Sequence, residues 1–237
     1  MIGTFLTIDS VICSEILSKD LDFIIIDREH AAHSLGETRN LMNACCEECE
    51  KFVRVHSCER IEIQRVLELN PDGIFIPQIS SLEDAKNAIS FSLYAPLGTR
   101  GLSPYTRPFD YSPANVNIQK TSINKKLKIA FLIEGQTGIE ALSDILKGYS
   151  NDISVIYFGL YDFSSSLNLE ADWENQKVKN GLHQIVSLCK TFDVNVGTIA
   201  RTHKEISILK ELGVKYIVFQ NDVGILKSGL DKIATYK

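Results

Sequence analysis

An alternation of short β-branched stretches with amphipathic stretches runs through the whole 237-residue chain and constrains its fold more than any other feature. The stretches expected as strands are residues 3–8, 23–29, 52–57, 73–79, 128–134, 153–159, 195–200 and 216–222. Those expected as helices, with apolar residues three or four apart, are 11–20, 37–49, 58–69, 81–93, 137–149, 177–192, 202–212 and 224–236. Eight strands, each followed by a helix, predict a (β/α)8 TIM barrel in a single domain over residues 1–237.

The rival architecture for such a pattern is an open, doubly wound α/β sheet. That fold carries a Gly-x-Gly-x-x-Gly turn after its first strand, and none follows the first predicted strand here. Residues 102–125, rich in Pro, Ser, Tyr and Asn, interrupt the regular spacing and predict a long excursion over one face of the barrel. The closed barrel therefore remains the preferred prediction.

Composition and charge exclude several functional classes. A net charge of −5 argues against a nucleic-acid surface, which needs a basic stripe. No apolar run approaches the roughly 20 residues that span a bilayer. The first residues lack the basic region and cleavage site of a signal peptide, so a cytoplasmic location is expected. Cys45, Cys46 and Cys49 lie close together, but no second pair completes a zinc site, which indicates reduced, structural cysteines.

Polar residues gather where the predicted strands end, which is where barrel enzymes place their chemistry. Strand by strand they are Asp27, Glu29 and His30; Arg54 and His56; Gln78; Glu134; Asp162; Thr198 and Arg201; Gln220 and Asp222. Singly, Glu134 and Asp162 also fit helix caps or solvated groups, and Arg54 also fits a structural partner of a carboxylate. Together with His30 they form a cluster whose burial requires a ligand or a metal. Strand-end charges contribute little packing, so replacing Arg54 is expected to leave the fold intact.

One class of aldolase is disfavoured directly by the residues. A Schiff-base enzyme needs a lysine that projects from a strand into the barrel and has a pKa lowered by burial. Lys128 stands at the start of a predicted strand, at the wrong end of the barrel. No predicted strand carries a lysine that would project into the barrel. The lack of such a lysine favours a metal-dependent route for any chemistry on a carbonyl compound.

The chain resembles the HpcH/HpaI aldolase/citrate lyase family, in particular its class II 2-keto-3-deoxy-acid aldolase branch. The matching segments, in the family's order, are "FIIIDREH", "FVRVHS", "IQRVLEL", "GIFIPQISSLEDAKNAI", "YAPLGTRG", "FLIEGQTGIEAL", "YFGLYDFSSSLN" and "LKELGVKYIVFQND". The resemblance implies a phosphoenolpyruvate/pyruvate-type TIM barrel. It also implies cleavage or formation of a 4-hydroxy-2-oxo acid from pyruvate and an aldehyde.

The resemblance implies a divalent cation, Mg²⁺, Mn²⁺ or Co²⁺, held by Glu134 and Asp162. Hard carboxylate oxygens suit such ions, which act as Lewis acids toward a 2-oxo acid. The backbone N–H groups of Tyr161 and Asp162 would bind the substrate carboxylate. Arg54 would stabilise the charge that develops on the keto oxygen.

The resemblance also implies a proton-transfer group. His30, whose ordinary pKa lies near neutrality, would move protons through a water molecule. Glu68, on the third helix, occupies the place of the acid that raises the basicity of this histidine, and Asp27 belongs to the same cluster.

The sequence departs from the family pattern in its substrate pocket. Leu132 stands where a glutamine usually contacts substrate, Glu68 where an aspartate is usual, and Phe5 where a tryptophan is common. The metal and proton groups are retained, so the substrate is the property most open to change. Alternatives are a citrate-lyase-like lyase acting on a CoA thioester and a barrel that has lost catalysis and kept a binding role.

The last predicted helix carries an apolar stripe of Ile225, Leu226, Leu230 and Ile233. An exposed stripe of this kind is an association surface. By resemblance, the helix would pack on a neighbouring subunit of a homo-oligomer, possibly a hexamer. No nucleic-acid or membrane partner is expected.

Overall fold

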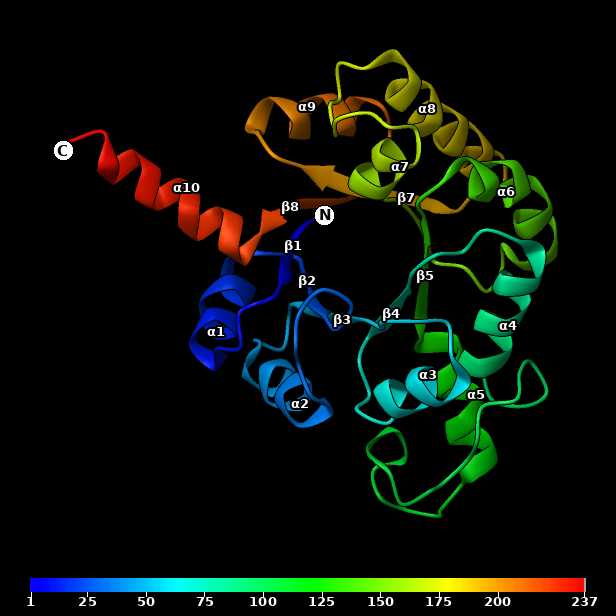
Figure 1. The fold of residues 1–237 in the computed structure, drawn as a ribbon. Coiled ribbons are helices and arrows are strands. Elements are labelled where there is room, and N and C mark those ends of the chain that lie inside the picture. Colours follow the sequence, from blue (N-terminus) through cyan, green and yellow to red (C-terminus); the bar gives the residue numbers. More distant parts are fainter. Residues whose placement is uncertain (237) are drawn as a thin grey trace.

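The computed structural model describes residues 1–236, and their eight strands close into a parallel barrel (Figure 1). The strands are β1 (Ile2–Leu6), β2 (Phe23–Asp27), β3 (Glu50–Arg54), β4 (Gly73–Ile76), β5 (Lys128–Ile133), β6 (Val155–Phe158), β7 (Asn195–Ala200) and β8 (Tyr216–Asn221). Each strand pairs in parallel with the next along the chain, and β8 pairs with β1. The predicted (β/α)8 architecture is confirmed, and the open-sheet alternative is excluded.

Each of the predicted helices is present close to its expected position. They are α1 (Val11–Asp20), α2 (Leu35–Ala44), α3 (Arg60–Leu67), α4 (Leu82–Ser92), α6 (Gln136–Tyr149), α8 (Gln176–Thr191), α9 (His203–Glu211) and α10 (Asp222–Ala234). The prediction for α2 was wrong at its end, because Cys45 is already extended and Cys46 N–H donates to Ser18 Oγ at 2.9 Å. The cysteines of residues 1–236 are free thiols.

Two helices were not predicted. The excursion between α4 and β5 contains a 3₁₀ turn, η1 (Arg107–Phe109), and a helix, α5 (Val116–Lys126), none of whose residues is buried. A helix without a buried face has no apolar periodicity to read. The second, α7 (Leu160–Ser166), is a short helix directly after β6.

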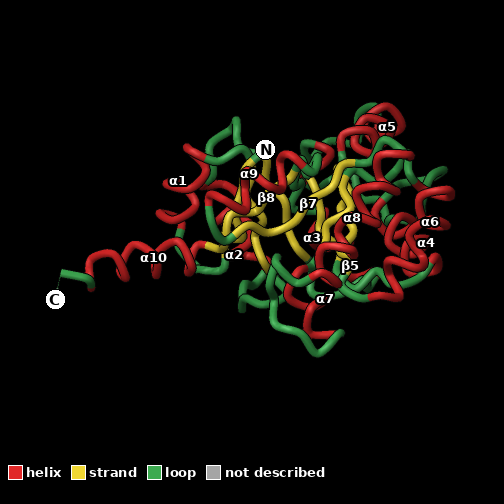
Figure 2. Tube along the Cα trace, turned by 90° about the horizontal axis from the view of Figure 1, so that it is seen from above, coloured by secondary structure: helices red, strands yellow, loops and turns green. Residues whose placement is uncertain are grey.

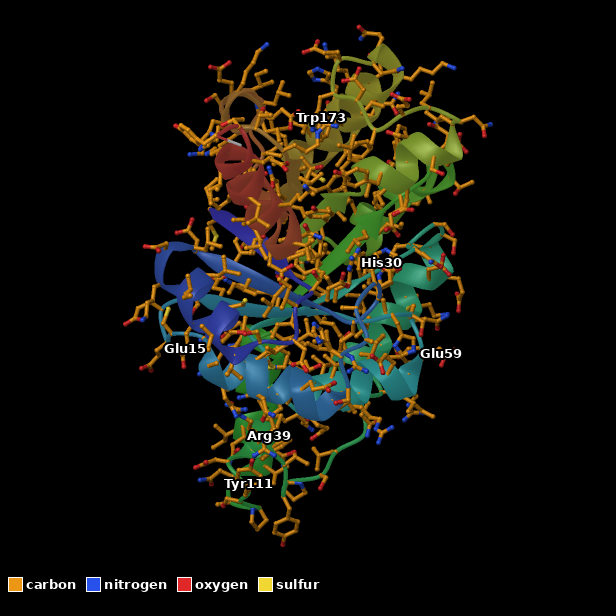
Figure 3. All side chains as sticks on the ribbon, turned by 60° about the vertical axis from the view of Figure 1, so that its left-hand side comes forward. Glu15, His30, Arg39, Glu59, Tyr111 and Trp173 are labelled. Atoms are coloured by element: carbon orange, nitrogen blue, oxygen red, sulfur yellow. The ribbon has the colours of Figure 1, made fainter. Side chains whose placement is uncertain are left out.

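The excursion lies at the end of the barrel where the strands begin. It is anchored there through Asn124, whose Oδ1 accepts from Tyr94 N–H at 2.9 Å and whose Nδ2 donates to Tyr94 O at 2.9 Å. In Figure 3, Tyr111 of this excursion stands far from His30, which follows the opposite end of β2. The excursion therefore takes no part in the polar cluster at the strand ends.

Aromatic rings fill the inside of the barrel. Phe52 packs edge-on against Phe23, Phe75 and Tyr216, with ring centroids 6.0, 5.2 and 6.1 Å away. Tyr157 extends this cluster through Phe75, with ring centroids 5.5 Å apart. Gly197 leaves room for Tyr157, because a Cβ at Gly197 would lie 2.9 Å from its ring. These rings fill the barrel between the starts of the strands and their C-terminal ends, where barrel enzymes place their active sites.

Helix α10 leaves the barrel and extends away from it, as Figures 1 and 2 show. Its apolar stripe is exposed, at 58% for Leu226, 53% for Leu230 and 63% for Ile233. The stripe predicted from sequence is thus uncovered within one chain. Within residues 1–236, no helix is both long and apolar enough to cross a membrane.

Candidate active site

A cavity of about 680 Å³ opens at the C-terminal ends of the strands. Its lining consists of Phe5, Thr7, Asp27, His30, Arg54, Leu132, Glu134, Tyr157, Gly159, Leu160, Tyr161, Asp162, Ile199, Arg201, Gln220, Asn221 and Gly224. The structure therefore brings together every site residue predicted from sequence except Glu68.

A buried ion pair joins β2 to β3 at the cavity wall. Asp27 and Arg54 are register partners, so their side chains leave neighbouring strands at the same level. Arg54 donates twice to Asp27, Nε to Oδ1 at 2.9 Å and Nη2 to Oδ2 at 2.8 Å. Its guanidinium also stacks over Phe5, 4.4 Å from the ring centroid. Burial alone would lower the pKa of Arg54, but the bonds to Asp27 outweigh it and the pKa is raised.

Glu29 is a second carboxylate of this cluster, to which the sequence assigned no role. Its Oε2 lies 3.1 Å from Arg54 Nη1 and 3.9 Å from His30 Nε2. Burial raises the pKa of Glu29, and the negative charges of Asp27 and Asp162 add to that effect, while Arg54 opposes it. The position of Glu29 at the end of a buried strand could have indicated a role in the site. Its contact with Arg54, however, depends on how β3 lies beside β2.

Glu134 enters the cavity directly after β5. Its Oε2 accepts from the backbone N–H of Gln78 at 2.7 Å, and Gln78 holds that N–H in place with a left-handed φ of 58°. Gly159 must be a glycine here, because a Cβ at that residue would lie 2.7 Å from Glu134 Cγ. Burial raises the pKa of Glu134 to about 7 despite the bond from Gln78, with further contributions from Glu29 and Asp162.

Asp162 lies in the first turn of α7, which begins directly after Gly159. The N–H groups of Tyr161 and Asp162 precede the first hydrogen bond of that helix, from Phe163 N–H to Gly159 O at 2.9 Å. They remain available for an acceptor outside the helix. The structure thus places both predicted carboxylates, and both predicted N–H donors, beside one cavity.

The donor set fits a hard divalent cation. Glu134 and Asp162 offer carboxylate oxygens. Burial, and to a smaller extent the negative charges of Glu29 and Asp162, raise the pKa of Glu134, and a bound cation would favour its ionised form. No group of three or more His, Cys, Asp or Glu side chains in residues 1–236 is arranged to hold a metal. A cation would therefore take most of its ligands from water and substrate, as Mg²⁺ commonly does with one or two carboxylates.

His30 stands at the cavity mouth with 63% of its side chain exposed. Its backbone N–H donates to Asp27 Oδ1 at 3.3 Å, which ties the residue to the end of β2.

Glu68 lies elsewhere. It caps the C-terminus of α3, at the end of the barrel where β4 begins, and its Oε1 is 3.5 Å from Arg100 Nη2. Within one chain, Glu29 rather than Glu68 is the acid beside His30.

The floor and the far side of the cavity complete the site. Phe5, Leu132 and Tyr157 are almost entirely buried, and Phe5 packs edge-on against Tyr157 with centroids 6.1 Å apart. Arg201 and Gln220, which the sequence placed at strand ends without a role, line the side formed by β7 and β8.

Known proteins resemble this chain in sequence. Residues 2–221 match the sequence profile described as HpcH/HpaI aldolase/citrate lyase. A 5-keto-4-deoxy-D-glucarate aldolase of Klebsiella pneumoniae is 23% identical over 235 residues, which cover 98% of this chain and 90% of that protein. The Salmonella arizonae protein of the same name is 24% identical over 239 residues, covering 100% and 92%.

Solved structures share the fold. An HpcH/HpaI aldolase/citrate lyase family protein from Burkholderia cenocepacia superposes with a TM-score of 0.92 at 21% identity, covering 100% of this chain and 93% of that one. The citrate synthase SbnG superposes with a TM-score of 0.86 at 23% identity, covering 99% and 92%. At such identities the likeness establishes the barrel and leaves the substrate open.

Proposed function

Because the chain belongs to the HpcH/HpaI aldolase/citrate lyase family, we propose that it is a metal-dependent aldolase acting on a 2-oxo acid. The reaction would interconvert a 4-hydroxy-2-oxo acid with pyruvate and an aldehyde. The observation that supports this most is the meeting of Glu134 and Asp162 with Arg54 and His30 around one cavity. The relatives named as aldolases support the same reaction class.

A divalent cation held by Glu134 and Asp162 would act as a Lewis acid on the oxygens of the 2-oxo acid. Arg54 would stabilise the negative charge that develops on the keto oxygen as the carbon–carbon bond breaks. A guanidinium has five N–H groups, and those on Asp27 and Glu29 fix its orientation while leaving others for substrate. The N–H groups of Tyr161 and Asp162 would bind the substrate carboxylate.

His30 would carry protons between the substrate and solvent. In the cleavage direction the 4-hydroxyl loses its proton, the bond between C3 and C4 breaks, and the released three-carbon fragment takes a proton on its methyl carbon. An imidazole at the mouth can accept the first proton and return one through water. The Glu29 carboxylate lies 3.9 Å from His30 Nε2, beside the ring that would carry the proton.

The apolar floor would keep water from the reacting carbons. Phe5 and Leu132 are 8% and 1% exposed, and neither offers a polar group to the substrate. Leu132 is two residues before Glu134, so both side chains point into the barrel from β5. Leu132 would therefore lie directly beneath the reacting atoms. The side chain of Leu132 therefore favours a substrate that is apolar at this point. In this branch of the family a glutamine side chain is expected at the same position.

The test is pyruvate release, by a coupled assay, from a panel of 4-hydroxy-2-oxo acids with and without Mn²⁺. Titration calorimetry with Mn²⁺ alone gives a readout that is independent of turnover. Glu134→Gln and Asp162→Asn should each weaken Mn²⁺ binding at least tenfold, whereas Asp144→Asn, on the exposed surface of α6, should not. Activity that survives exhaustive chelation would overturn the metal-dependent proposal.

A further inference from the structure

Glu62 is a buried carboxylate outside the cavity, in the first turn of α3. Its side chain is 9% exposed, and that of its partner Arg28 is equally buried. Arg28 Nε donates to Glu62 Oε1 at 3.0 Å and Nη2 donates to Oε2 at 3.4 Å, so the two planar groups meet through both carboxylate oxygens. Neither residue lines the cavity, and the proposed reaction does not use them.

Arg28 holds both ends of the segment that carries His30. This segment, residues 28–34, joins β2 to α2 without regular structure, and we call it the His30 segment. Near its end, His33 O accepts from Nη1 of Arg28 at 2.8 Å. The guanidinium of Arg28 therefore closes the segment on itself and ties its start to α3 through Glu62.

Glu62 also reaches the residues that follow β3. His56 Nδ1 lies 3.1 Å from Glu62 Oε1, the same oxygen that accepts from Arg28 Nε. His56 comes two residues after Arg54, which is assigned to the developing negative charge. One carboxylate thus links the ends of β2 and β3, whose last residues form the ion pair of Asp27 with Arg54.

Local contacts alone hold His30 loosely. Its side chain is 63% exposed, and its Nε2 is 3.9 Å from Glu29 Oε2. Its backbone N–H donates to Asp27 Oδ1 at the long distance of 3.3 Å. Proton transfer requires the ring to stay within hydrogen-bonding reach of the substrate or of one bridging water. The placement of His30 therefore depends on how firmly the segment that carries it is anchored.

We propose that Glu62 is a positioning residue for proton transfer: through Arg28 it holds the His30 segment in the orientation that presents the imidazole to the cavity. This inference rests on the proposed aldolase function, in which His30 carries protons. A buried ion pair adds little net stability over an apolar pair of similar volume, because desolvation offsets the attraction. It does impose direction, because a guanidinium and a carboxylate pair in one plane. Replacing the pair by apolar residues should therefore preserve the fold and lose the orientation.

The test measures exchange of the pyruvate methyl protons into D₂O with Mn²⁺ present, at a temperature where the variants are folded. Glu62→Gln should lower the maximal exchange rate about tenfold to a hundredfold, the range for a small misplacement of a reacting group. The KM for pyruvate and the Kd for Mn²⁺ should stay at their wild-type values, because Glu134 and Asp162 follow other strands.

Glu59→Gln is the matched control. Glu59 directly precedes α3, is exposed, and makes no capping hydrogen bond with its side chain. Figure 3 shows it on the same side of the molecule as His30. The same chemical change at Glu59 should leave the exchange rate, the KM and the Kd unchanged.

Replacing both partners, Arg28→Met with Glu62→Met, separates positioning from folding. The apolar pair should recover most of the Tm lost in Glu62→Gln, because no buried charge is left unpaired. Exchange should stay low, because a flexible methionine imposes no direction on the His30 segment. Glu62→Asp keeps the charge and should recover part of the exchange rate. Exchange that returns to the wild-type rate together with Tm in the methionine pair would assign the ion pair to folding alone and overturn the inference.

Exchange by the wild-type protein separates this inference from the proposed function. A wild-type protein that exchanges the methyl protons, with Glu62→Gln as fast as Glu59→Gln, would overturn the inference alone. A loss of Mn²⁺ affinity in parallel with exchange in Glu62→Gln would indicate a general distortion of the cavity and would also overturn it. A wild-type protein that does not exchange these protons would overturn the aldolase proposal and the inference with it.

Discussion

Replacing Arg54 by alanine should destabilise the protein as well as impair its reaction, contrary to what strand-end charges suggest from sequence. Arg54, Asp27 and Glu29 have side chains only 9%, 2% and 10% exposed. Removing one partner of a buried ion pair costs about 3–5 kcal/mol, because a buried charge is left uncompensated. Asp27 keeps bonds from the N–H groups of Glu29 and His30, so we expect the lower end, about 3 kcal/mol.

The stability lost in Arg54→Ala should increase as the pH rises. Burial raises the pKa of Glu29 above its ordinary 4.5, and Arg54 opposes that rise, so Arg54→Ala raises the pKa further. A carboxyl group with a raised folded-state pKa stabilises the fold below its unfolded pKa, and this contribution is lost as pH rises through the folded value. The difference between Arg54→Ala and wild type should therefore be larger at pH 7 than at pH 4.5.

Thermal unfolding measures this effect. For a chain of this size, 3 kcal/mol corresponds to a fall in Tm of roughly 6–12 °C. Arg65→Ala, an exposed arginine on α3, is the control and should change Tm little. Combining Arg54→Ala with Asp27→Asn removes one stranded charge and should recover part of the loss. A Tm within about 2 °C of wild type, at both pH values, would refute the argument that this ion pair is a buried structural element.

Four further predictions follow from the site and from α10. With its pKa raised to about 7, Glu134 should make the metal-free protein lose stability, by roughly 3 kcal/mol, as pH rises from 4.5 to 7. Denaturant titrations of Glu134→Gln should show a flatter pH dependence, and an unchanged slope would exclude Glu134 as the cause. His30→Ala should slow exchange of the pyruvate methyl protons in D₂O, and unchanged exchange would exclude His30 as the proton carrier. Leu132→Gln should leave activity on the protein's own substrate unchanged or lower it, because the substitution buries an amide in an apolar floor at a cost of about 1–3 kcal/mol. A tenfold gain in activity on simple hydroxy-oxo acids would instead indicate a decayed aldolase. Leu230→Glu, in the exposed stripe of α10, should reduce the oligomer mass seen by light scattering, and a wholly monomeric wild type at micromolar concentration would contradict the expected homo-oligomer.

The sequence by itself determined the elements and their order. Every strand of the barrel was found, because a strand covered by helices on one side and rings on the other is apolar along its length, as in β2, "FIIID". The places where those runs stop identified Asp27, Arg54, Glu134 and the chain segment of Asp162. The spacing of apolar residues along the chain reflects burial, so it indicates which residues are buried and where each element ends.

Only the tertiary structure decided which of those residues meet. Arg54 pairs with Asp27 because β2 and β3 have one register, and a shift of one residue would have turned either side chain away. Glu68 and His30, both expected in one cluster, lie at opposite ends of the barrel, because α3 runs back toward the starts of the strands. The N–H of Gln78 reaches Glu134 through a backbone turn that no pattern announces. Contacts of this kind join residues far apart in the chain, and they exist only once barrel closure has fixed every strand against its neighbours.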